Sequence, residues 1–381
     1  MKTAILGFGI VGSGAYEVLE KAGYEVKKVL DIKPHPELGD KLTSNFDDIL
    51  NDKEISVVAE AIGGLEPAHT FVVKALRAKK NVVSSNKHLI CTYYDELLSL
   101  AKDNNVKILF TASAGGGIPW LFNLKRSLCA DDIIEVSGII NGTTNYILDA
   151  METSHRLFND VLEEAKSLGF AEANPSADID GLDLARKIAI SSSIAFNTVV
   201  KENQVSTLPL RNITLDDIDY CKTLGKKVKY MSYGIKNDNT LSVFVEPTLI
   251  DCNSIEASVS TNNNMVSLYG KNVGKLSFYG QGAGKYPTGH SLACDVIDII
   301  TGKASFEYNP KELSVDNNNL KRKYFIRTTS DVSGEIVFKK EQVDNVRYII
   351  TNYVSVSSMN RFAKEILLAD EFAFIAGFEE K

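Results

Sequence analysis

The sequence has no long apolar run. None of its hydrophobic stretches approaches the ~20 residues that a membrane-spanning helix requires, so no membrane-embedded role is expected. The first three residues lead straight into a strand-like run, and we therefore expect no secretory signal. There is also no surplus of positive charge, because 42 Lys and Arg face 49 Asp and Glu for a net charge of −7. This balance argues against nucleic acid as a partner, which would require a basic face.

Cysteine and histidine are scarce and scattered. The cysteines are odd in number and form no CxxC pair, which fits a reducing compartment without a zinc site. The cytoplasm is therefore the expected location. No two histidines stand at ligand spacing, so a histidine metal site is not expected either. The residues are Cys91, Cys129, Cys221, Cys252, Cys294, His35, His69, His88, His155 and His290.

What the chain does contain is a large apolar fraction, 44% of 381 residues, which is sufficient for two or three ordinary globular domains. In the first 110 residues, short apolar runs alternate with segments of helical periodicity. This alternation predicts right-handed crossovers and a parallel sheet. We expect strands at Thr3–Leu6, Val26–Leu30, Ile55–Ile62, Asn81–Ser84 and Val106–Phe110, and helices at Val11–Leu19, Thr70–Lys79 and Asp95–Lys102.

The pattern changes near residue 115, where a glycine-rich loop at 114–119 stops the strand before it. The alternation of polar and apolar residues at 227–260 predicts hairpins of a mixed or antiparallel sheet. Other expected elements are a strand at Ile133–Ile140, helices at 155–170, 182–196 and Ser291–Thr301, a polar linker at 310–322, and strand, strand, helix and strand within 323–381.

A glycine fingerprint follows the first expected strand. Residues 7–12 read Gly-Phe-Gly-Ile-Val-Gly and open the first helix, which is the context that gives GxGxxG its meaning. Gly7 allows a tight turn, Gly9 lets the backbone approach a pyrophosphate, and Gly12 lets the helix pack closely on the sheet. Ile10 and Val11 begin the helix whose N–H groups would face the phosphates. The alternative is a glycine turn with a purely structural role.

Asp31 ends the second expected strand, 24 positions after Gly7. A carboxylate at this place accepts hydrogen bonds from both ribose hydroxyls and repels a 2′-phosphate, which favours NAD over NADP. Lys33 and His35 stand close by and can weaken that preference. Asp31 can also simply begin the turn that Pro34 and Pro36 continue.

Two lysines stand where a proton-transferring group would be useful. Asp183 and Lys187 are four positions apart, so that on a helix they would lie on one face. They form either an ordinary surface ion pair or a lysine held by a carboxylate to give a proton to a carbonyl oxygen. Lys87 follows the fourth expected strand, at the sheet edge where ligands bind in parallel sheets. It can equally be an ordinary surface lysine.

The chain resembles homoserine dehydrogenase over nearly its whole length. Seven motifs carry the resemblance, and they occur in the family's order. They are GFGIVG at 7–12, EAIGG at 60–64, SSNK at 84–87, AGGGIP at 114–119, NGTTNYIL at 141–148, ADIDGLDLARK at 177–187 and YGQGAGKYPTG at 279–289.

The resemblance implies reversible conversion of L-homoserine to L-aspartate 4-semialdehyde, with hydride carried by NAD or NADP. It implies a role in threonine and methionine biosynthesis and a homodimer or higher homo-oligomer. It assigns proton transfer to Lys187 and places Lys87 between cofactor and substrate. Substrate-holding acids would be Glu172 and Asp183, with Asp178 supporting them, and further cofactor contacts would come from Gly63, Gly64 and Gly282.

Two positions depart from the family pattern. Family members commonly carry a glutamate at the position of Thr111, where it helps backbone carbonyls to hold a sodium or potassium ion. The matching carbonyls here would be those of Ala114, Gly116 and Ile118, and without the carboxylate a monovalent cation is expected to bind weakly or not at all. The second departure is His290, where small residues are usual. Its larger side chain can alter the cofactor cleft.

The resemblance also implies a division of the chain. We expect a Rossmann-type dinucleotide-binding domain at 1–130, to which the helix near 291–301 returns. An α+β catalytic and dimerisation domain is expected at 131–309. The tail at 323–381 resembles an ACT regulatory domain that lacks roughly one helix and one strand, and it is expected to serve packing or dimerisation rather than to bind an effector.

Two other functions stay open at this stage. The departures at Thr111 and His290 are also compatible with a paralogue that acts on another small amino aldehyde or alcohol. A cofactor-binding sensor without catalysis would keep the same fold. The complete set of acids and lysines speaks against the sensor.

Overall fold

The computed structural model describes residues 1–304, 308–332 and 336–379. The chain divides into two compact units that are each built from segments distant in the sequence. The first comprises Met1–Ala130, Ser193–Val199 and Gly280–Lys311, and the second comprises Asp131–Ser192, Val200–Tyr279 and Glu312–Lys381. The first unit thus contains all of 280–311 and not the helix near 291–301 alone, and the C-terminal tail shares the second unit.

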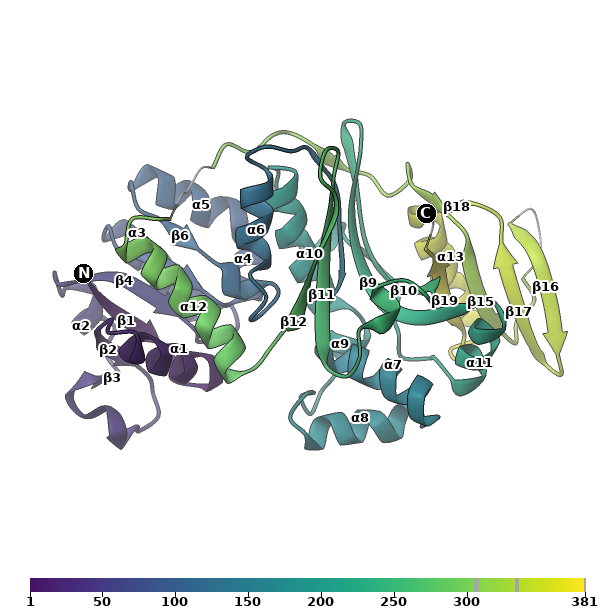
Figure 1. Cartoon of the computed structure of the whole chain (residues 1–381), viewed down its shortest axis with the longest axis horizontal. Coiled ribbons are helices and arrows are strands. Elements are labelled where there is room, and N and C mark those ends of the chain that lie inside the picture. The colour runs from purple at the N-terminus through teal and green to yellow at the C-terminus, as the bar shows by residue number, and fades with distance from the viewer. Residues whose placement is uncertain (305–307, 333–335, 380–381) are drawn as a thin grey trace. The chain divides into compact units, whose positions relative to one another are not determined.

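The first unit is built on a parallel six-stranded sheet with the order β3-β2-β1-β4-β5-β6 (Figure 1). The five expected strands are confirmed, and a short strand, β3, was not predicted. Because β4 pairs with β1 on the side away from β2, the strand order reverses between β1 and β4. Ligands of open parallel sheets bind outside the carboxyl ends at such a reversal. The strands are β1 (Lys2–Leu6), β2 (Val26–Leu30), β3 (Leu42–Thr43), β4 (Ile55–Glu60), β5 (Asn81–Ser84) and β6 (Ile108–Leu109).

Helices α1 and α12 lie side by side against this sheet (Figure 1). Their backbones approach so closely that a Cβ on Gly14 would stand 2.2 Å from the Lys285 carbonyl oxygen, and one on Gly289 would stand 2.6 Å from the Ala15 nitrogen. Helix α12 begins before the predicted Ser291, since Pro287 is tolerated in a first turn where N–H groups lack helical partners. The helices are α1 (Ile10–Lys21), α2 (Asp47–Leu50), α3 (Ala68–Arg77), α4 (Lys87–Thr92), α5 (Tyr94–Asp103), α6 (Trp120–Ser127) and α12 (Lys285–Ile300).

The second unit is built on a mixed sheet with the order β12-β11-β7-β9-β10-β19-β15-β17-β16. The predicted hairpin is confirmed, because β9 and β10 pair antiparallel over twelve residues each. Short strands β8 and β13 also pair with β10. The strands are β7 (Ile133–Ile139), β8 (Ser206–Thr207), β9 (Lys226–Asn237), β10 (Thr240–Asp251), β11 (Asn263–Gly270), β12 (Gly274–Gln281), β13 (Ser314–Val315), β14 (Lys321–Arg322), β15 (Tyr324–Thr328), β16 (Val337–Val343), β17 (Val346–Thr351), β18 (Val354–Ser355) and β19 (Phe374–Phe378).

The helices of the second unit differ from the prediction at one place. The single helix expected at 155–170 is wrong at its start, because His155 adopts a left-handed conformation (φ 51°) that ends one helix before the next begins. The preceding helix, α7, was not predicted, although Asn141 is a favoured N-cap residue. The helices are α7 (Gly142–Ser154), α8 (Phe158–Ser167), α9 (Ser176–Ile179), α10 (Leu182–Ala195), α11 (Leu215–Thr223) and α13 (Val356–Ala369).

The tail continues the sheet of the second unit. Strand β19 pairs parallel with β10 through Thr248 and Gly377, and β15 pairs with both β19 and β17. Among its described residues the tail has five strands and one helix, in the order β15, β16, β17, β18, α13 and β19, where strand, strand, helix and strand were expected. Residues 333–335, between β15 and β16, lie outside the described residues.

The predicted linker at 310–322 is wrong as well. Asn317 is buried, and its side-chain carbonyl accepts a hydrogen bond from the Val243 N–H at 2.8 Å. Its amide donates to the Ser206 hydroxyl at 3.1 Å. An asparagine side chain can form the hydrogen bonds that a neighbouring backbone would otherwise form. The Asn-rich segment, whose composition predicts a solvated linker, is therefore anchored to strand β10.

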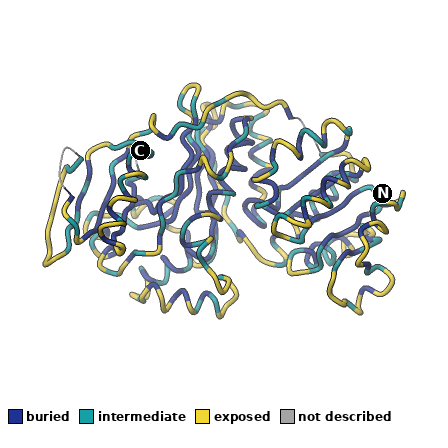
Figure 2. The backbone as a smooth tube through the Cα atoms, turned by 180° about the vertical axis from the view of Figure 1, so that it is seen from behind, coloured by how far each residue is buried: buried dark blue, intermediate teal, exposed yellow. Residues whose placement is uncertain are grey.

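Burial follows the two sheets. The strands are mostly dark blue in Figure 2, while the helices carry exposed outer faces. In the first unit, Ile5, Val57 and Leu292 pack in one apolar cluster. All five cysteines are free thiols. Among the described residues, no helix has both the length and the hydropathy needed to cross a membrane.

Candidate active site

The glycine fingerprint has the geometry of a phosphate cradle. Gly7 has φ +88°, and a Cβ there would stand 2.8 Å from the Ala61 carbonyl oxygen. A Cβ on Gly12 would stand 1.9 Å from the Gly7 carbonyl oxygen, while one on Gly9 would meet no atom within 4 Å. Gly9 caps α1 without a side-chain hydrogen bond, so the first turn presents backbone N–H groups to open space. The residues therefore fit a dinucleotide pyrophosphate.

Asp31 stands next to this cradle. Its carboxylate accepts hydrogen bonds from the Phe8 N–H at 2.6 Å and from the Lys33 N–H at 2.9 Å. Although burial raises its pKa, these N–H groups and the nearby His35 lower the pKa below its ordinary value. The ring of His35 lies edge-on to Phe8, with a centroid distance of 4.9 Å, and its Nε2 is 3.7 Å from the Asp31 carboxylate. Asp31 is therefore an ionised carboxylate at the end of β2.

Four further predicted cofactor contacts lie in the first unit, three of them in loops and one at the start of a helix. Gly63 and Gly64 follow β4 with φ values of +82° and +69°, which only glycine adopts readily. Gly282 packs against Gly116, where a Cβ would stand 2.2 Å from the Gly282 carbonyl oxygen. Lys87 is the first residue of α4, directly after β5. Each loop lies at the carboxyl end of a strand or beside the glycine-rich loop.

The acid and lysine cluster is the clearest polar constellation of the second unit. The Lys187 ammonium donates to the Asp183 carboxylate at 2.8 Å and to the Ile140 carbonyl oxygen at 2.7 Å. Both side chains are almost fully buried, with 10% and 6% of their surfaces exposed. The predicted pairing across one helical turn of α10 is therefore confirmed. A surface ion pair, the alternative, is excluded by this burial.

Asn141 completes the cluster, and its role was not predicted. Its amide donates to Asp178 at 2.7 Å and to Asp183 at 2.9 Å, while its carbonyl oxygen accepts from the Thr144 N–H as the N-cap of α7. One asparagine thus fixes two carboxylates of different helices. The signal in the sequence was an N-cap residue ahead of a helical segment.

The start of α10 depends on a glycine. Gly181 has φ +85°, and a Cβ there would stand 2.4 Å from the Tyr230 hydroxyl oxygen. This close approach places Asp183 in the first turn of the helix, directed to Asn141. Among the described residues, the hydrogen bonds of the cluster do not include Glu172, which is exposed in the segment between α8 and α9.

The loop whose carbonyls match the family's cation site forms hydrogen bonds within the chain. The Thr111 hydroxyl and N–H donate to Asp295 at 2.7 and 2.8 Å. The Gly116 carbonyl oxygen accepts from the Ser291 hydroxyl at 2.6 Å, and the Ile118 carbonyl oxygen accepts from a backbone N–H at 2.7 Å. Burial raises the pKa of Asp295 to about 7, so this acid is a poor substitute for a permanently charged ligand. Where the family commonly has a glutamate, Thr111 thus brings a neutral hydroxyl that is already bonded to Asp295.

His290 lies exposed on α12, with its ring 3.7 Å from the Cys294 sulfur.

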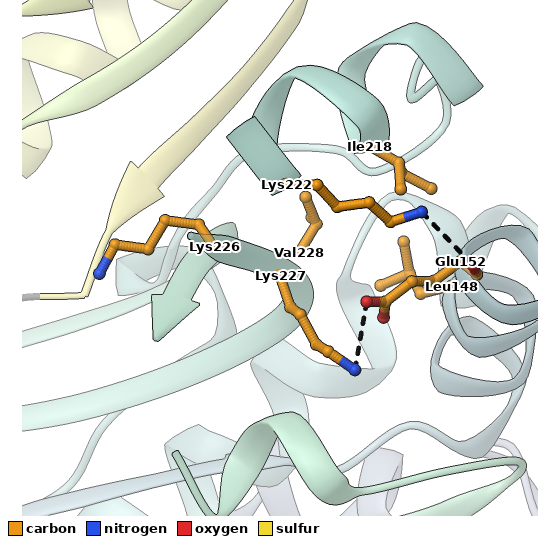
Figure 3. A pocket seen from close by; sticks show the side chains of 7 residues that line it. All are labelled: Leu148, Glu152, Ile218, Lys222, Lys226, Lys227 and Val228. Atoms are coloured by element: carbon orange, nitrogen blue, oxygen red, sulfur yellow. Dashed lines mark hydrogen bonds and ion pairs between the residues drawn. The ribbon is translucent and has the colours of Figure 1, made fainter. Parts of the chain in front are cut away.

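A separate hollow of the second unit is lined by Leu148, Glu152, Ile218, Lys222, Lys226, Lys227 and Val228 (Figure 3). Lys227 pairs with Glu152 at 3.1 Å there. This hollow has no interior space for even a water molecule, so we do not assign it a ligand.

Comparison with known proteins gives consistent matches along the chain. A family model described as homoserine dehydrogenase matches residues 119–297, and one described as the NAD binding domain of homoserine dehydrogenase matches residues 7–111. The homoserine dehydrogenase of Bacillus subtilis is 38% identical over 315 residues, covering 79% of this chain and 73% of that protein. That of Synechocystis is 39% identical over 331 residues, covering 81% and 76%.

Solved structures agree with the sequence comparison. The crystal structure of a homoserine dehydrogenase from Thiobacillus denitrificans matches with a TM-score of 0.89 at 29% identity, covering 100% of this chain and 98% of that one. The Staphylococcus aureus homoserine dehydrogenase at pH 7.5 matches with a TM-score of 0.79 at 29% identity, covering 100% and 99%. The similarity therefore extends over both units and the tail.

Proposed function

This chain belongs to the homoserine dehydrogenase family, and from this premise we propose that it interconverts L-homoserine and L-aspartate 4-semialdehyde in threonine and methionine biosynthesis. The observation that carries the assignment of roles is the buried Lys187, held between Asp183 and a backbone carbonyl. An amine in such a place can exchange a proton with the substrate oxygen while hydride moves to or from the neighbouring carbon.

The nicotinamide ring supplies or accepts the hydride when the cofactor is bound. The chain's own task is to manage charge. In the reducing direction, the Lys187 ammonium donates a proton to the aldehyde oxygen as negative charge develops there, and in the oxidising direction the neutral amine takes the hydroxyl proton. Asp183 and the Ile140 carbonyl fix the direction of Nζ throughout.

The acids provide for the other end of the substrate. Homoserine carries an ammonium group, and we propose that Asp178 and Asp183 attract it while Asn141 holds both carboxylates in place. Glu172 is assigned to the ammonium by resemblance to the family, from its exposed position before α9. Lys87 is assigned to the space between cofactor and substrate on the same basis. These assignments place acids near positive charge and lysines near developing negative charge.

We propose NAD rather than NADP as the preferred cofactor. The ionised Asp31 carboxylate at the end of β2 supports this choice, because it would accept from ribose hydroxyls and repel a 2′-phosphate. In Asp31→Asn, the preference for NAD over NADP, measured as the ratio of the two dissociation constants, is expected to fall about tenfold or more, the effect of ~1.4 kcal/mol. Isothermal titration with each cofactor measures that ratio.

Glu37→Gln is the matched control, because Glu37 is a nearby exposed acid whose side chain is 62% exposed. It is expected to leave both dissociation constants unchanged. Tighter binding of NADP than of NAD by the unmodified protein would show that Asp31 does not set the preference.

The site geometry also predicts indifference to monovalent cations. Because a ligand that binds only the folded state raises its stability, a bound ion would raise the melting temperature saturably. Exchange of potassium or sodium chloride for choline chloride at equal ionic strength is expected to change the melting temperature by less than about 1 °C and turnover by less than about twofold. A saturable rise with potassium or sodium, but not with choline, would contradict the assignment of Thr111, Asp295 and Ser291.

We further propose that the protein works in the cytoplasm as a homo-oligomer, most simply a dimer. Strand β12 forms an edge of the large sheet, and Tyr269, Val273 and Tyr279 on and beside it are about half exposed. Such apolar side chains on a sheet edge favour a protein partner. Sedimentation velocity measures the assembly, and a single monomeric species at micromolar concentration would contradict it.

A further inference from the structure

Glu60 is a buried acid whose position has no explanation in the packing of the sheet. It is the last residue of β4, and none of its surface is exposed. Burial raises its pKa. Because β4 adjoins β1 at the reversal of the strand order, the residue lies at the end of the sheet where ligands bind. A buried carboxyl group is costly unless hydrogen bonds satisfy it, so its partners indicate what it is for.

The first set of partners belongs to the loop after β4. One carboxylate oxygen, Oε1, accepts from the Ile62 N–H at 2.9 Å and from the Gly63 N–H at 3.3 Å. These contacts fix the turn at Gly63 and Gly64, where both φ angles are positive. The carboxyl group thus serves as the acceptor for backbone N–H groups that no longer have a partner in the sheet once strand β4 has ended.

The second set of partners belongs to the loop after β5. The other oxygen, Oε2, accepts from the Ser84 hydroxyl at 2.5 Å, and the Asn86 amide approaches Oε1 at 3.4 Å. The same amide donates to the Gly64 carbonyl oxygen at 2.7 Å. One carboxyl group and one amide therefore connect two loops at neighbouring strand ends.

This network ends at Lys87. The Asn86 side-chain oxygen caps α4 by accepting from the Leu89 N–H at 3.1 Å, and the Asn86 N–H donates to the Ser84 hydroxyl oxygen at 3.1 Å. Lys87 is the first residue of that helix. Any shift of Asn86 therefore moves the helix start and the backbone of Lys87 with it.

We propose that Glu60 is a positioning residue for cofactor binding and hydride transfer, which fixes the glycine turn at 62–64 and the start of α4 in one relative placement. It acts through Ile62, Ser84 and Asn86 and does not touch the substrate. The proposal rests on the proposed function in one respect, namely that these two loops serve the cofactor and Lys87.

Glu60→Gln tests the proposal with little change in volume. The glutamine oxygen can still accept from Ile62 and Gly63, but its NH₂ group faces Ser84. The Ser84 hydroxyl then loses its acceptor and can bond to residue 60 only by accepting, in place of the short bond that it donates to the carboxylate. The link between the two loops is weakened while the strand remains filled. Glu60→Ala removes both links, and the glutamine variant keeps the test valid if the alanine variant does not fold.

Lys80→Met is the matched control. Lys80 is also buried, and its ammonium donates to the carbonyl oxygens of Asp52 and Ile55 at 2.8 and 2.7 Å, at the amino end of the same strand β4. Both substitutions remove a buried ionisable group that lies at one end of strand β4. Only Glu60 lies at the ligand end, so a purely structural role predicts equal consequences for the two.

The measurements are the melting temperature, the dissociation constant of NADH from fluorescence titration, and kcat and KM with homoserine. For Glu60→Gln we expect a 10- to 100-fold loss in kcat/KM, the order of effect of a misplaced group, and about tenfold weaker NADH binding. Lys80→Met is expected to lower the melting temperature and to leave the NADH dissociation constant and kcat/KM unchanged. Unchanged NADH binding and kcat in Glu60→Gln, or equal losses in both variants, would overturn the proposal.

The NADH titration separates this proposal from the proposed function. If the unmodified protein binds NADH but does not turn over homoserine, the proposed substrate is wrong, while the difference between Glu60→Gln and Lys80→Met in NADH binding still decides the role of Glu60.

Discussion

Replacement of Lys187 by alanine is expected to reduce kcat by about 10²- to 10⁴-fold, the usual contribution of a positioned proton donor. The ammonium group is held by Asp183 and the Ile140 carbonyl, and alanine offers no group that can exchange a proton. The dissociation constant of NADH is expected to stay within about twofold of the original value, because the glycine fingerprint belongs to the other unit. Steady-state kinetics and fluorescence titration measure the two quantities.

A matched control for Lys187→Ala is the substitution of a second buried lysine of the same unit. Lys229 donates to the Val259 carbonyl oxygen at 2.6 Å and to Asn145 at 3.1 Å, and burial lowers its pKa to about 8. Lys229→Met is expected to lower the melting temperature with only a small change in kcat. If Lys187→Ala turned over homoserine at a near-normal rate, Lys187 would have no part in the chemistry.

The pH profile gives a readout that a structural role would not move. In the proposed mechanism the oxidising direction uses Lys187 as the neutral amine. If so, the part of the pH profile that depends on the ionisation of Lys187 is expected to disappear in Lys187→Ala. The residual rate would then follow other groups. Loss of stability alone would lower the rate without changing the shape of the profile.

The parts of the structure that follow from local rules were predictable. Strand β4 and the turn at Gly7 need only an apolar run and a glycine before a helix, and both occur where expected. The pair Asp183 and Lys187 was predictable because helical spacing alone brings residues four apart to one face.

The parts that depend on distant contacts were not predictable. Asn141 meets Asp178 and Asp183, 37 and 42 positions away, and the sequence carries no rule for such contacts. Asn317 reads as solvated because its anchoring to Val243 depends on a strand 74 positions away. The sequence does contain a signal for Glu60, because it is the one acid in the apolar run 55–62. A carboxyl group in an otherwise apolar strand is expected only where buried donors need it.

The second large effect concerns stability and lies where the tail joins the sheet. Arg322 and Glu246 form a buried pair with 3.3 Å between Nε and Oε1, and their side chains are 6% and 2% exposed. The guanidinium carbon lies 4.8 and 5.1 Å from the ring centroids of Tyr233 and Phe244, which stack on each other with their centroids 4.9 Å apart. It also donates to the Phe378 carbonyl oxygen at 2.8 Å in β19. One side chain thus connects β10, the aromatic pair and the last strand.

Arg322→Met is expected to reduce the free energy of unfolding by about 3–5 kcal/mol, because it leaves the Glu246 carboxylate buried without its partner. Glu246→Gln in the same chain removes that charge, so the double variant is expected to be more stable than Arg322→Met alone. Urea denaturation of the unmodified protein, Arg322→Met, Glu246→Gln alone and the double variant gives the coupling between the two residues. Equal stability of Arg322→Met and the unmodified protein would show that the pair contributes nothing to holding the tail.

The pH dependence of Arg322→Met has a definite sign. Burial raises the pKa of Glu246 to about 7 even beside the arginine, and loss of the arginine raises it further. A carboxyl group whose pKa is higher in the folded state than in the unfolded state binds more protons when folded, so stability falls as the pH rises between the two values. Arg322→Met is therefore expected to lose more stability, relative to the unmodified protein, at pH 8 than at pH 5. The variant that also carries Glu246→Gln cannot titrate at this position and should lose this difference, which assigns the pH dependence to Glu246 and not to the other acids of the chain.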